Sequence, residues 1–117
     1  MNEEELALRQ MESALLDSMY YHPDFQVIIE DHLLLLRANP TGYIEVADNE
    51  AYRFEFDYYN LLRFKGIPYK YHWIVMRVND FLSPFDAHQG IKKIIIPDYQ
   101  RIERLFNMYL TVIGQVQ

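Results

Sequence analysis

The pattern of apolar and polar positions predicts an amphipathic helix at the start of the chain. Between residues 3 and 20, large apolar side chains recur at spacings of three and four residues: Leu8, Met11, Leu15 and Met19. This spacing places them on one face of a helix, and Asn2 and Glu5 have the spacing of a capping box at its start. We expect this face to fold back on the rest of the chain. Packing against another chain is the alternative.

A pair of helices is predicted in the middle of the chain. Asp57 can cap the first helix, and Gly66 suits its left-handed final position. Pro68 fits the first turn of the second helix, and Asn79 tolerates a positive φ at its end. The apolar positions are Leu61, Leu62 and Phe64 in the first helix, and Tyr69, Trp73, Ile74, Met76 and Val78 in the second. We predict that Trp73, in the middle of the second stripe, anchors the core.

Two strands flank this pair of helices in the prediction. Residues 91–96 are rich in β-branched side chains and stop at Pro97, after a loop over residues 80–90. Residues 52–56 alternate aromatic with charged side chains, as a half-buried strand does. We predict that 52–56 and 91–96 pair antiparallel, with both helices packed on one face of the pair.

A final helix is predicted over residues 98–113. Asp98 can cap its start, and Gly114 suits its end. Its apolar positions follow a helical spacing: Ile102, Leu105, Phe106, Tyr109, Leu110 and Ile113.

Residues 24–37 fit two different structures. Their apolar positions suit a helix that begins after Pro23, but the turn sequence at residues 39–42 equally suits a hairpin that returns through residues 43–46. We favour a strand over residues 32–37, because a strand at 43–46 needs a neighbour.

The order strand, helix, helix, strand resembles the LysM fold. In that family the second helix ends in Asn, a loop of the Asp-Pro type follows, and a Gly leads into a last strand that ends in Ile-Pro. The matching positions here are Asn79, Ser83-Pro84, Gly90 and Ile96-Pro97. The family's Gly-Asp-Thr after the first strand is replaced by Phe56-Asp57-Tyr58, so that only the Asp is kept.

These expectations give an α+β fold and divide the chain into two parts. Residues 1–22 form an N-terminal amphipathic helical arm, and residues 23–117 form a LysM-like domain. The strand-helix-helix-strand core of this domain covers 50–97, the C-terminal helix covers 98–113, and an extra hairpin lies upstream if the strand at 32–37 forms.

A narrower resemblance lies in the second helix of the pair and the loop after it. The string YHWIVMRVND at residues 71–80, followed by Ser83-Pro84-Phe85, is similar to a pattern in LysM-like baseplate wedge proteins of contractile-tailed bacteriophages. The resemblance covers residues 50–98. It implies a structural subunit that packs against other phage baseplate and tail proteins, in multiple copies, in a symmetric assembly. The implied location is the virion tail baseplate, after assembly in the host cytoplasm.

Composition narrows the classes of partner. The chain has 117 residues, a net charge of −6, ten Tyr and seven Phe, and this many aromatic residues favour interfaces. The acidic charge argues against nucleic acid, because phosphate contacts need a basic surface. With no Cys, no disulfide or zinc–thiolate site is expected. We expect no signal peptide, because the N-terminus is acidic, and no membrane span, because apolar runs are short. A helix lying on a membrane surface is also not expected, because the polar face of the N-terminal helix is acidic.

Catalytic and metal-binding patterns are weak. The four His residues (His22, His32, His72 and His88) are scattered, and no two have the i, i+4 spacing of a helical metal pair. Asp86 and His88 could supply two ligands on a loop, but a third would have to come from a distant segment. His72, beside Trp73, suits a hydrogen-bonded packing or interface role better than that of a general base. We therefore expect no enzyme activity, no cofactor, no metal and no small-molecule substrate.

Three functional classes remain. The first is the baseplate subunit, in which the LysM-like body packs and the terminal helices contact neighbouring chains. The second is a LysM-type module that binds peptidoglycan or related glycans, through loops that the resemblance places near Asp57-Tyr58 and residues 80–85. The third is a soluble adaptor domain. We favour the first class, because the second lacks the Gly and Thr of the family motif and any tandem repeat.

The candidate residues fall into two sets. The interface candidates are Leu8, Met11, Leu15, Met19, Tyr58, Tyr69, Tyr71, His72, Phe81, Phe85, Phe106 and Tyr109. The expected core anchors are Leu61, Leu62, Trp73, Met76, Asn79, Ile94 and Ile96.

Overall fold

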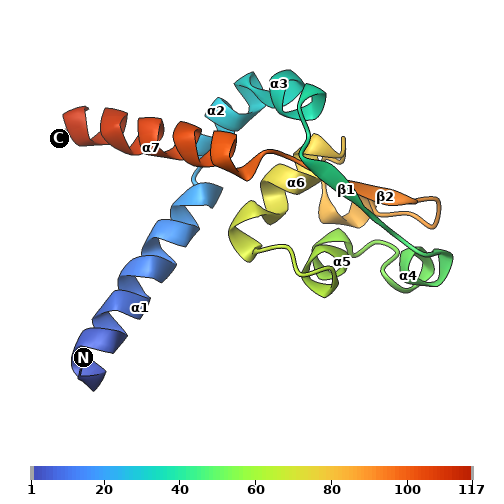
Figure 1. The fold of residues 1–117 in the computed structure, drawn as a ribbon, viewed down its shortest axis with the longest axis horizontal. Coiled ribbons are helices and arrows are strands. Elements are labelled where there is room, and N and C mark those ends of the chain that lie inside the picture. The colour runs from blue at the N-terminus through green and yellow to red at the C-terminus, as the bar shows by residue number, and fades with distance from the viewer. Residues whose placement is uncertain (1, 117) are drawn as a thin grey trace.

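The computed structural model describes residues 2–116 and shows a mostly helical α+β fold (Figure 1). The helices are α1 (Glu3–Ser18), α2 (Pro23–Asp31), α3 (Leu33–Ala38), α4 (Asp48–Arg53), α5 (Tyr58–Phe64), α6 (His72–Val78) and α7 (Tyr99–Val116). Three 3₁₀ turns are η1 (Met19–Tyr21), η2 (Tyr69–Tyr71) and η3 (Pro84–Asp86). The α+β class is confirmed at this level.

The sheet of the described chain has two antiparallel strands. Strand β1 (Gly42–Glu45) pairs with β2 (Lys93–Ile96) in a register that places Gly42 opposite Ile96 and Glu45 opposite Lys93. The predicted C-terminal strand is confirmed, although it begins at Lys93. The strand predicted at 43–46 also forms, but its neighbour is β2.

The strand predicted at residues 52–56 is wrong. Helix α4 occupies Asp48–Arg53, and the Glu50 carboxylate accepts a hydrogen bond from the Ala47 N–H at its start (2.9 Å). After the helix, Phe56 has φ +62° and donates its N–H to the Ala87 carbonyl (2.8 Å). This local capping and turn geometry prevails over the period-two alternation of aromatic residues, of which Phe54 alone is buried.

The favoured strand at residues 32–37 is also wrong. Helices α2 and α3 cover this region, as the alternative interpretation predicted. Pro23 opens α2, and Leu33 and Leu36 point into the core from α3 with a spacing of three residues. Because β2 completes the pairing of β1, a hairpin partner upstream of the turn is not needed.

The two predicted middle helices form, with different details. Gly66 has φ +80° after α5, as expected. Asp57 precedes α5, but its carboxylate accepts from the Asn60 side chain (2.7 Å) rather than from a backbone amide. Trp73 is half-buried, so the buried side of α6 is not centred on it. The buried residues of α6 are His72, Ile74, Val75, Met76 and Val78.

Asn79 ends α6 and holds strand β2. Its φ is −87°, so the expected positive φ is wrong; the left-handed residue is Asp80, at +68°. The Asn79 amide accepts from the Ile95 N–H (2.8 Å) and donates to the carbonyls of Ile95 (3.0 Å) and Val75 (2.8 Å). The side chain thereby satisfies the edge of β2 that faces away from β1.

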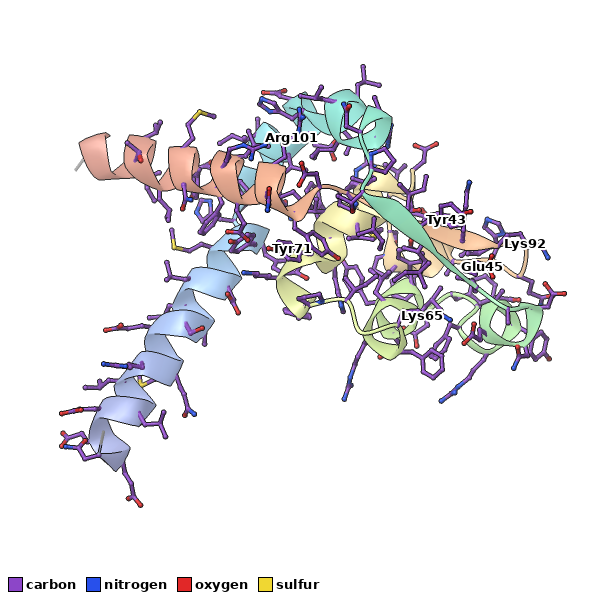
Figure 2. The ribbon with its side chains drawn as sticks, viewed as in Figure 1. Tyr43, Glu45, Lys65, Tyr71, Lys92 and Arg101 are labelled. Atoms are coloured by element: carbon purple, nitrogen blue, oxygen red, sulfur yellow. The ribbon has the colours of Figure 1, made fainter. Side chains whose placement is uncertain are left out.

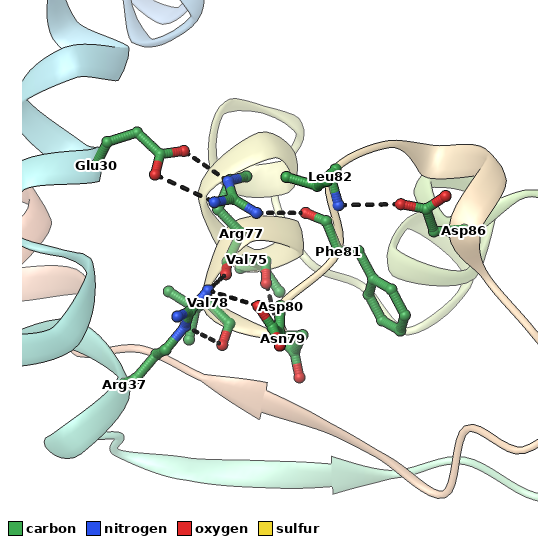
Figure 3. Close-up of polar contacts among 10 residues, drawn as sticks. All are labelled: Glu30, Arg37, Val75, Arg77, Val78, Asn79, Asp80, Phe81, Leu82 and Asp86. Atoms are coloured by element: carbon green, nitrogen blue, oxygen red, sulfur yellow. Dashed lines mark hydrogen bonds and ion pairs between the residues drawn. The ribbon is translucent and has the colours of Figure 1, made fainter.

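A cluster of arginine contacts joins the α2–α3 pair to the end of α6 (Figure 3). The Arg77 guanidinium donates to both oxygens of Glu30 (2.6 and 3.2 Å) and to the Phe81 carbonyl (2.9 Å). The Arg37 guanidinium donates to the carbonyls of Arg77 (2.7 Å) and Val78 (3.3 Å). The hydrogen bonds from Arg77 lower the pKa of Glu30 and keep it charged at neutral pH.

Helix α7 closes the fold over α2. The Asp98 carboxylate accepts from the Gln100 N–H (3.0 Å) and caps the helix as predicted. The predicted end at Gly114 is wrong, because α7 continues to Val116. One core joins α7 to α2, α5, α6 and β2; among its most deeply buried residues are Phe25, Ile29, Leu61, Leu62, Ile74, Met76, Ile94 and Ile102.

Candidate protein-interaction surface

Helix α1 stands away from the rest of the molecule. It projects from the body on one side of α7, and the two helices diverge (Figure 1). None of its residues is buried by the part of the chain that the structure describes. The radius of gyration is 16.0 Å, against about 13–14 Å for a compact domain of this length. The N-terminal helix is confirmed, but the expectation that it folds back is wrong.

The apolar side chains of α1 are consequently open to solvent. Five large ones are between 46% and 65% exposed: Leu6, Leu8, Met11, Leu15 and Leu16. Met19, next along the same stripe, is partly buried and packs against the core. The exposed stripe therefore begins next to the hydrophobic core and extends away from it along a helix about 24 Å long.

The charged side chains of α1 are almost all acidic. The helix carries five acids (Glu3, Glu4, Glu5, Glu12 and Asp17) and one base, Arg9. This gives −4 of the chain's net −6 to 16 residues, so the body is close to neutral. Three of the acids lie in the first turn, where the helix dipole stabilises them.

Aromatic packing fixes the base of α1. The Tyr20 ring stacks on Phe106 of α7 (centroids 3.9 Å apart) and meets the edge of Phe25 of α2 (5.7 Å). Beside it, Tyr21 stacks on Tyr69 (5.1 Å) and donates its hydroxyl to the Tyr69 carbonyl (2.5 Å). The direction of α1 is thus set by η1 rather than by contacts along the helix.

A partly buried polar contact strengthens this base. The Glu103 carboxylate accepts from the hydroxyls of Tyr20 (2.7 Å) and Tyr71, and Lys70 Nζ lies 3.4 Å away. Burial by itself raises the pKa of Glu103, but the two hydroxyls and the ammonium outweigh it and lower the pKa below its usual value. The carboxylate therefore contributes to stability above its normal range of titration, and this contribution is lost as the pH falls through the folded-state pKa.

Replacing this carboxylate tests its role at the base of the arm. Glu103→Gln keeps one acceptor oxygen, so we expect a loss of about 1–2 kcal/mol in the free energy of unfolding at pH 7. The loss should shrink in acid, and hydrogen exchange at η1 should become faster. Urea unfolding at several pH values measures this. Glu12→Gln, at an exposed position of α1, is the matched control, and an equal effect of both changes would contradict the assignment.

We compared the chain with known proteins. No protein-family model, no curated protein sequence and no solved structure matches it. The interpretation of the surface therefore depends on the residues themselves.

The structure divides the interface candidates into exposed and buried residues. The exposed candidates are Leu8, Met11 and Leu15 of the arm, together with Tyr69 and Phe85. Met19 and Phe81 are partly buried. Five candidates are wrong as interface residues, because they are buried within the chain: Tyr58, Tyr71, His72, Phe106 and Tyr109. Sequence reasoning missed Leu6 and Leu16 because they lie off the main stripe of the helix.

The core anchors are confirmed in part. Leu61, Leu62, Met76 and Ile94 are almost completely buried. Trp73, Asn79 and Ile96 are of intermediate exposure. His72 is a packing residue: its Nε2 lies 2.8 Å from the Ile67 carbonyl, and burial lowers its pKa.

The two loops at which the LysM resemblance predicts glycan binding, near Tyr58 and Phe81, are close to each other. Tyr58 is fully buried, and its ring lies 4.9 Å from that of Phe81. The hydroxyl of Tyr58 has no hydrogen-bond partner among the described residues. Side chains of the protein thus fill the space between the start of α5 and the loop after α6.

Two other kinds of feature are absent from the residues that the structure describes. These residues contain no cluster of three or more His, Cys, Asp or Glu side chains placed to hold a metal ion. No helix among them has the length and apolar character needed to span a membrane.

Proposed function

We propose that this chain is a structural subunit of a phage tail baseplate wedge, and that it acts by packing against other chains through α1. The observation that carries the proposal is the exposed apolar side of a helix whose base is rigidly held. Burying the three half-exposed side chains of the stripe, Leu8, Met11 and Leu15, is worth on the order of 3 kcal/mol before the cost of association. A helix already fixed at its base loses little further freedom on binding.

The body fits a packing role. We propose that residues 42–97 form a LysM-like unit in which β1, rather than 52–56, is the first strand. Three observations support this: helices α4, α5 and α6 lie between two antiparallel strands, the last strand ends at Ile96 directly before Pro97, and Asn79 binds the β2 backbone. The extra helix α4 is a departure from the family pattern.

The arm can be tested without disturbing the fold. Leu8→Glu together with Leu15→Glu should change the free energy of unfolding by less than about 0.5 kcal/mol, because neither side chain is buried. The same variant should fail to enter assembled particles. The matched control is Gln10→Glu with Ser13→Glu, which adds the same charge on the polar side of α1. Urea unfolding and quantitation of the chain in purified particles provide the two readouts.

Location tests the proposal directly. Antibody against the chain should label the base of contractile tails in electron micrographs of particles from the source. A particle map should then place α1 in contact with another subunit. Tails that carry no label, or that assemble with the Leu8→Glu/Leu15→Glu chain incorporated normally, would contradict the proposed function.

A further inference from the structure

A second surface of the chain has the opposite charge to α1. Between α3 and α7 lies a groove of about 290 Å³, which we call the α3–α7 groove. It is lined by His32, Leu35, Arg101, Arg104, Leu105 and Met108. Leu35 and Met108 are about half exposed, so the groove has an apolar surface open to solvent.

The two arginines of this groove lack acidic partners. Neither Arg101 nor Arg104 forms an ion pair with a side chain that the structure describes, although the acids Glu30, Glu50 and Glu103 all do. The Nε of Arg101 is buried and has no hydrogen-bond partner there. A carboxylate brought to the groove would meet two guanidinium charges that no acid of the described chain neutralises.

Helix α1 has the complementary chemistry. It presents an apolar stripe together with five acids, whereas the groove presents apolar side chains together with two free guanidinium groups. Two copies of α1 would repel each other in either orientation, since each carries a net charge of −4. The charges therefore favour contact between α1 and the groove over contact between two arms.

The arm cannot reach the groove of its own chain. Tyr20 holds the base of α1 through Glu103 and Phe106, whereas Arg101 and Arg104 lie two residues from these positions, about 200° around α7. Figure 2 shows Arg101 on the side of α7 next to α2, opposite the side from which α1 leaves. A fit between the two surfaces thus requires two molecules.

We propose that α1 of one copy docks in the α3–α7 groove of a second copy. The contact is head to tail, because one chain contributes its arm and the other its groove, so that the pair keeps one groove and one arm free. Repetition of such a contact produces a ring if the rotation closes and a filament if it does not. This inference rests on the proposed function, and it identifies the partner of the arm within a symmetric assembly.

Complementation between two defective variants tests this arrangement. The arm variant is Leu8→Glu/Leu15→Glu, and the groove variant is Arg104→Glu/Met108→Asp, which changes exposed side chains. Sedimentation velocity at low salt should show parent oligomers whose mass rises with concentration, while each variant stays at the 14.1 kDa monomer. An equimolar mixture should form a complex of two chains, because one good arm meets one good groove. Its affinity should fall at least tenfold in high salt.

A folding check and a control variant accompany this experiment. Circular dichroism establishes that each variant is folded, and Arg53→Glu/Leu82→Asp, at exposed positions outside both surfaces, should associate like the parent. A parent that stays monomeric at all concentrations would overturn the inference. So would a mixture of the two variants that does not associate, or an arm variant that is defective while the groove variant is not, since that result indicates an arm-to-arm dimer.

The same reagents separate this inference from the proposed function. If the parent is monomeric in solution but the arm variant is still excluded from particles, the arm binds another protein. That result overturns the head-to-tail contact and leaves the proposed function standing. If both variants enter particles normally, the proposed function fails as well.

Discussion

Replacing Phe106 with alanine should lower the free energy of unfolding by about 3–5 kcal/mol, the usual cost of removing a buried aromatic ring. Phe106 is 4% exposed and packs against Tyr20 (3.9 Å), Phe25 (5.2 Å) and Tyr109 (6.2 Å). These rings join α7, α2 and the base of α1, so a single cavity loosens three elements. For a domain with a stability of about 5–15 kcal/mol, this is a large fraction of the total.

Urea and thermal unfolding followed by circular dichroism measure this effect. Met108→Ala, on the exposed side of the same helix, is the matched control and should change stability by less than about 0.5 kcal/mol. Hydrogen exchange at η1 should also become faster in the Phe106 variant, because Tyr20 loses the ring on which it stacks. Equal stability of Phe106→Ala and Met108→Ala would show that the aromatic cluster does not hold the arm.

Replacing Asn79 with leucine should cost about 2–4 kcal/mol, because the Ile95 N–H and C=O then lose their partners at the edge of the sheet. The hydrogen bond from Asn79 to the Val75 carbonyl, which ends α6, is lost as well. Asn79→Asp should be at least as harmful at neutral pH. It keeps the acceptor for the Ile95 N–H but places a negative oxygen against two carbonyls.

A control variant separates the loss of the Asn79 hydrogen bonds from the general effect of replacing an Asn with Leu. Asn60→Leu is the matched control, because Asn60 is exposed and its side chain binds Asp57 alone among the described residues. Chemical unfolding should give similar free energies of unfolding for the parent and Asn60→Leu. Both Asn79 variants should have lower values. If Asn79→Leu were as stable as the control, the side chain would be dispensable for holding β2, and the support for a LysM-like unit would weaken.

The stability predictions depend on exposure that the sequence alone assigned incorrectly. Trp73, expected to anchor the core, is half-buried, so its removal should cost less than that of Phe106. The buried side of α6 is instead made by Ile74, Val75 and Met76, which lie one to three residues further along. A helix with apolar residues on several sides does not show by its pattern which side faces the core.

Local sequence signals determined the helices with good capping. Asn2 caps α1 through the Glu5 N–H, Asp98 caps α7, and Gly66 takes the left-handed position after α5. Each of these signals acts over a few residues, so it works without the rest of the fold. The strands at 43–46 and 91–96 were also evident from local composition, although not as partners of each other.

Strand pairing and the structure of residues 48–56 were decided by tertiary structure. Aromatic alternation at 52–56 indicated a strand, but Glu50 caps a helix there, and the Phe56 N–H binds the distant Ala87 carbonyl. Pairing joins segments about 50 residues apart in the sequence, and period two reveals a strand without naming its neighbour. Asn79 shows the same limit, because its main partner, Ile95, is 16 residues away.

Helices α1 and α7 show most clearly what the sequence pattern predicts and what only the packing of the fold decides. Both carry apolar residues at spacings of three and four, and both were predicted from that pattern. In α7 the stripe is buried against α2, whereas in α1 it is exposed along its length up to Met19. Periodicity determines that a helical face needs to be covered, because apolar surface is costly in water. Which chain covers it depends on where the helix is held, and here the packing of Tyr20 and Glu103 directs α1 away from its own core.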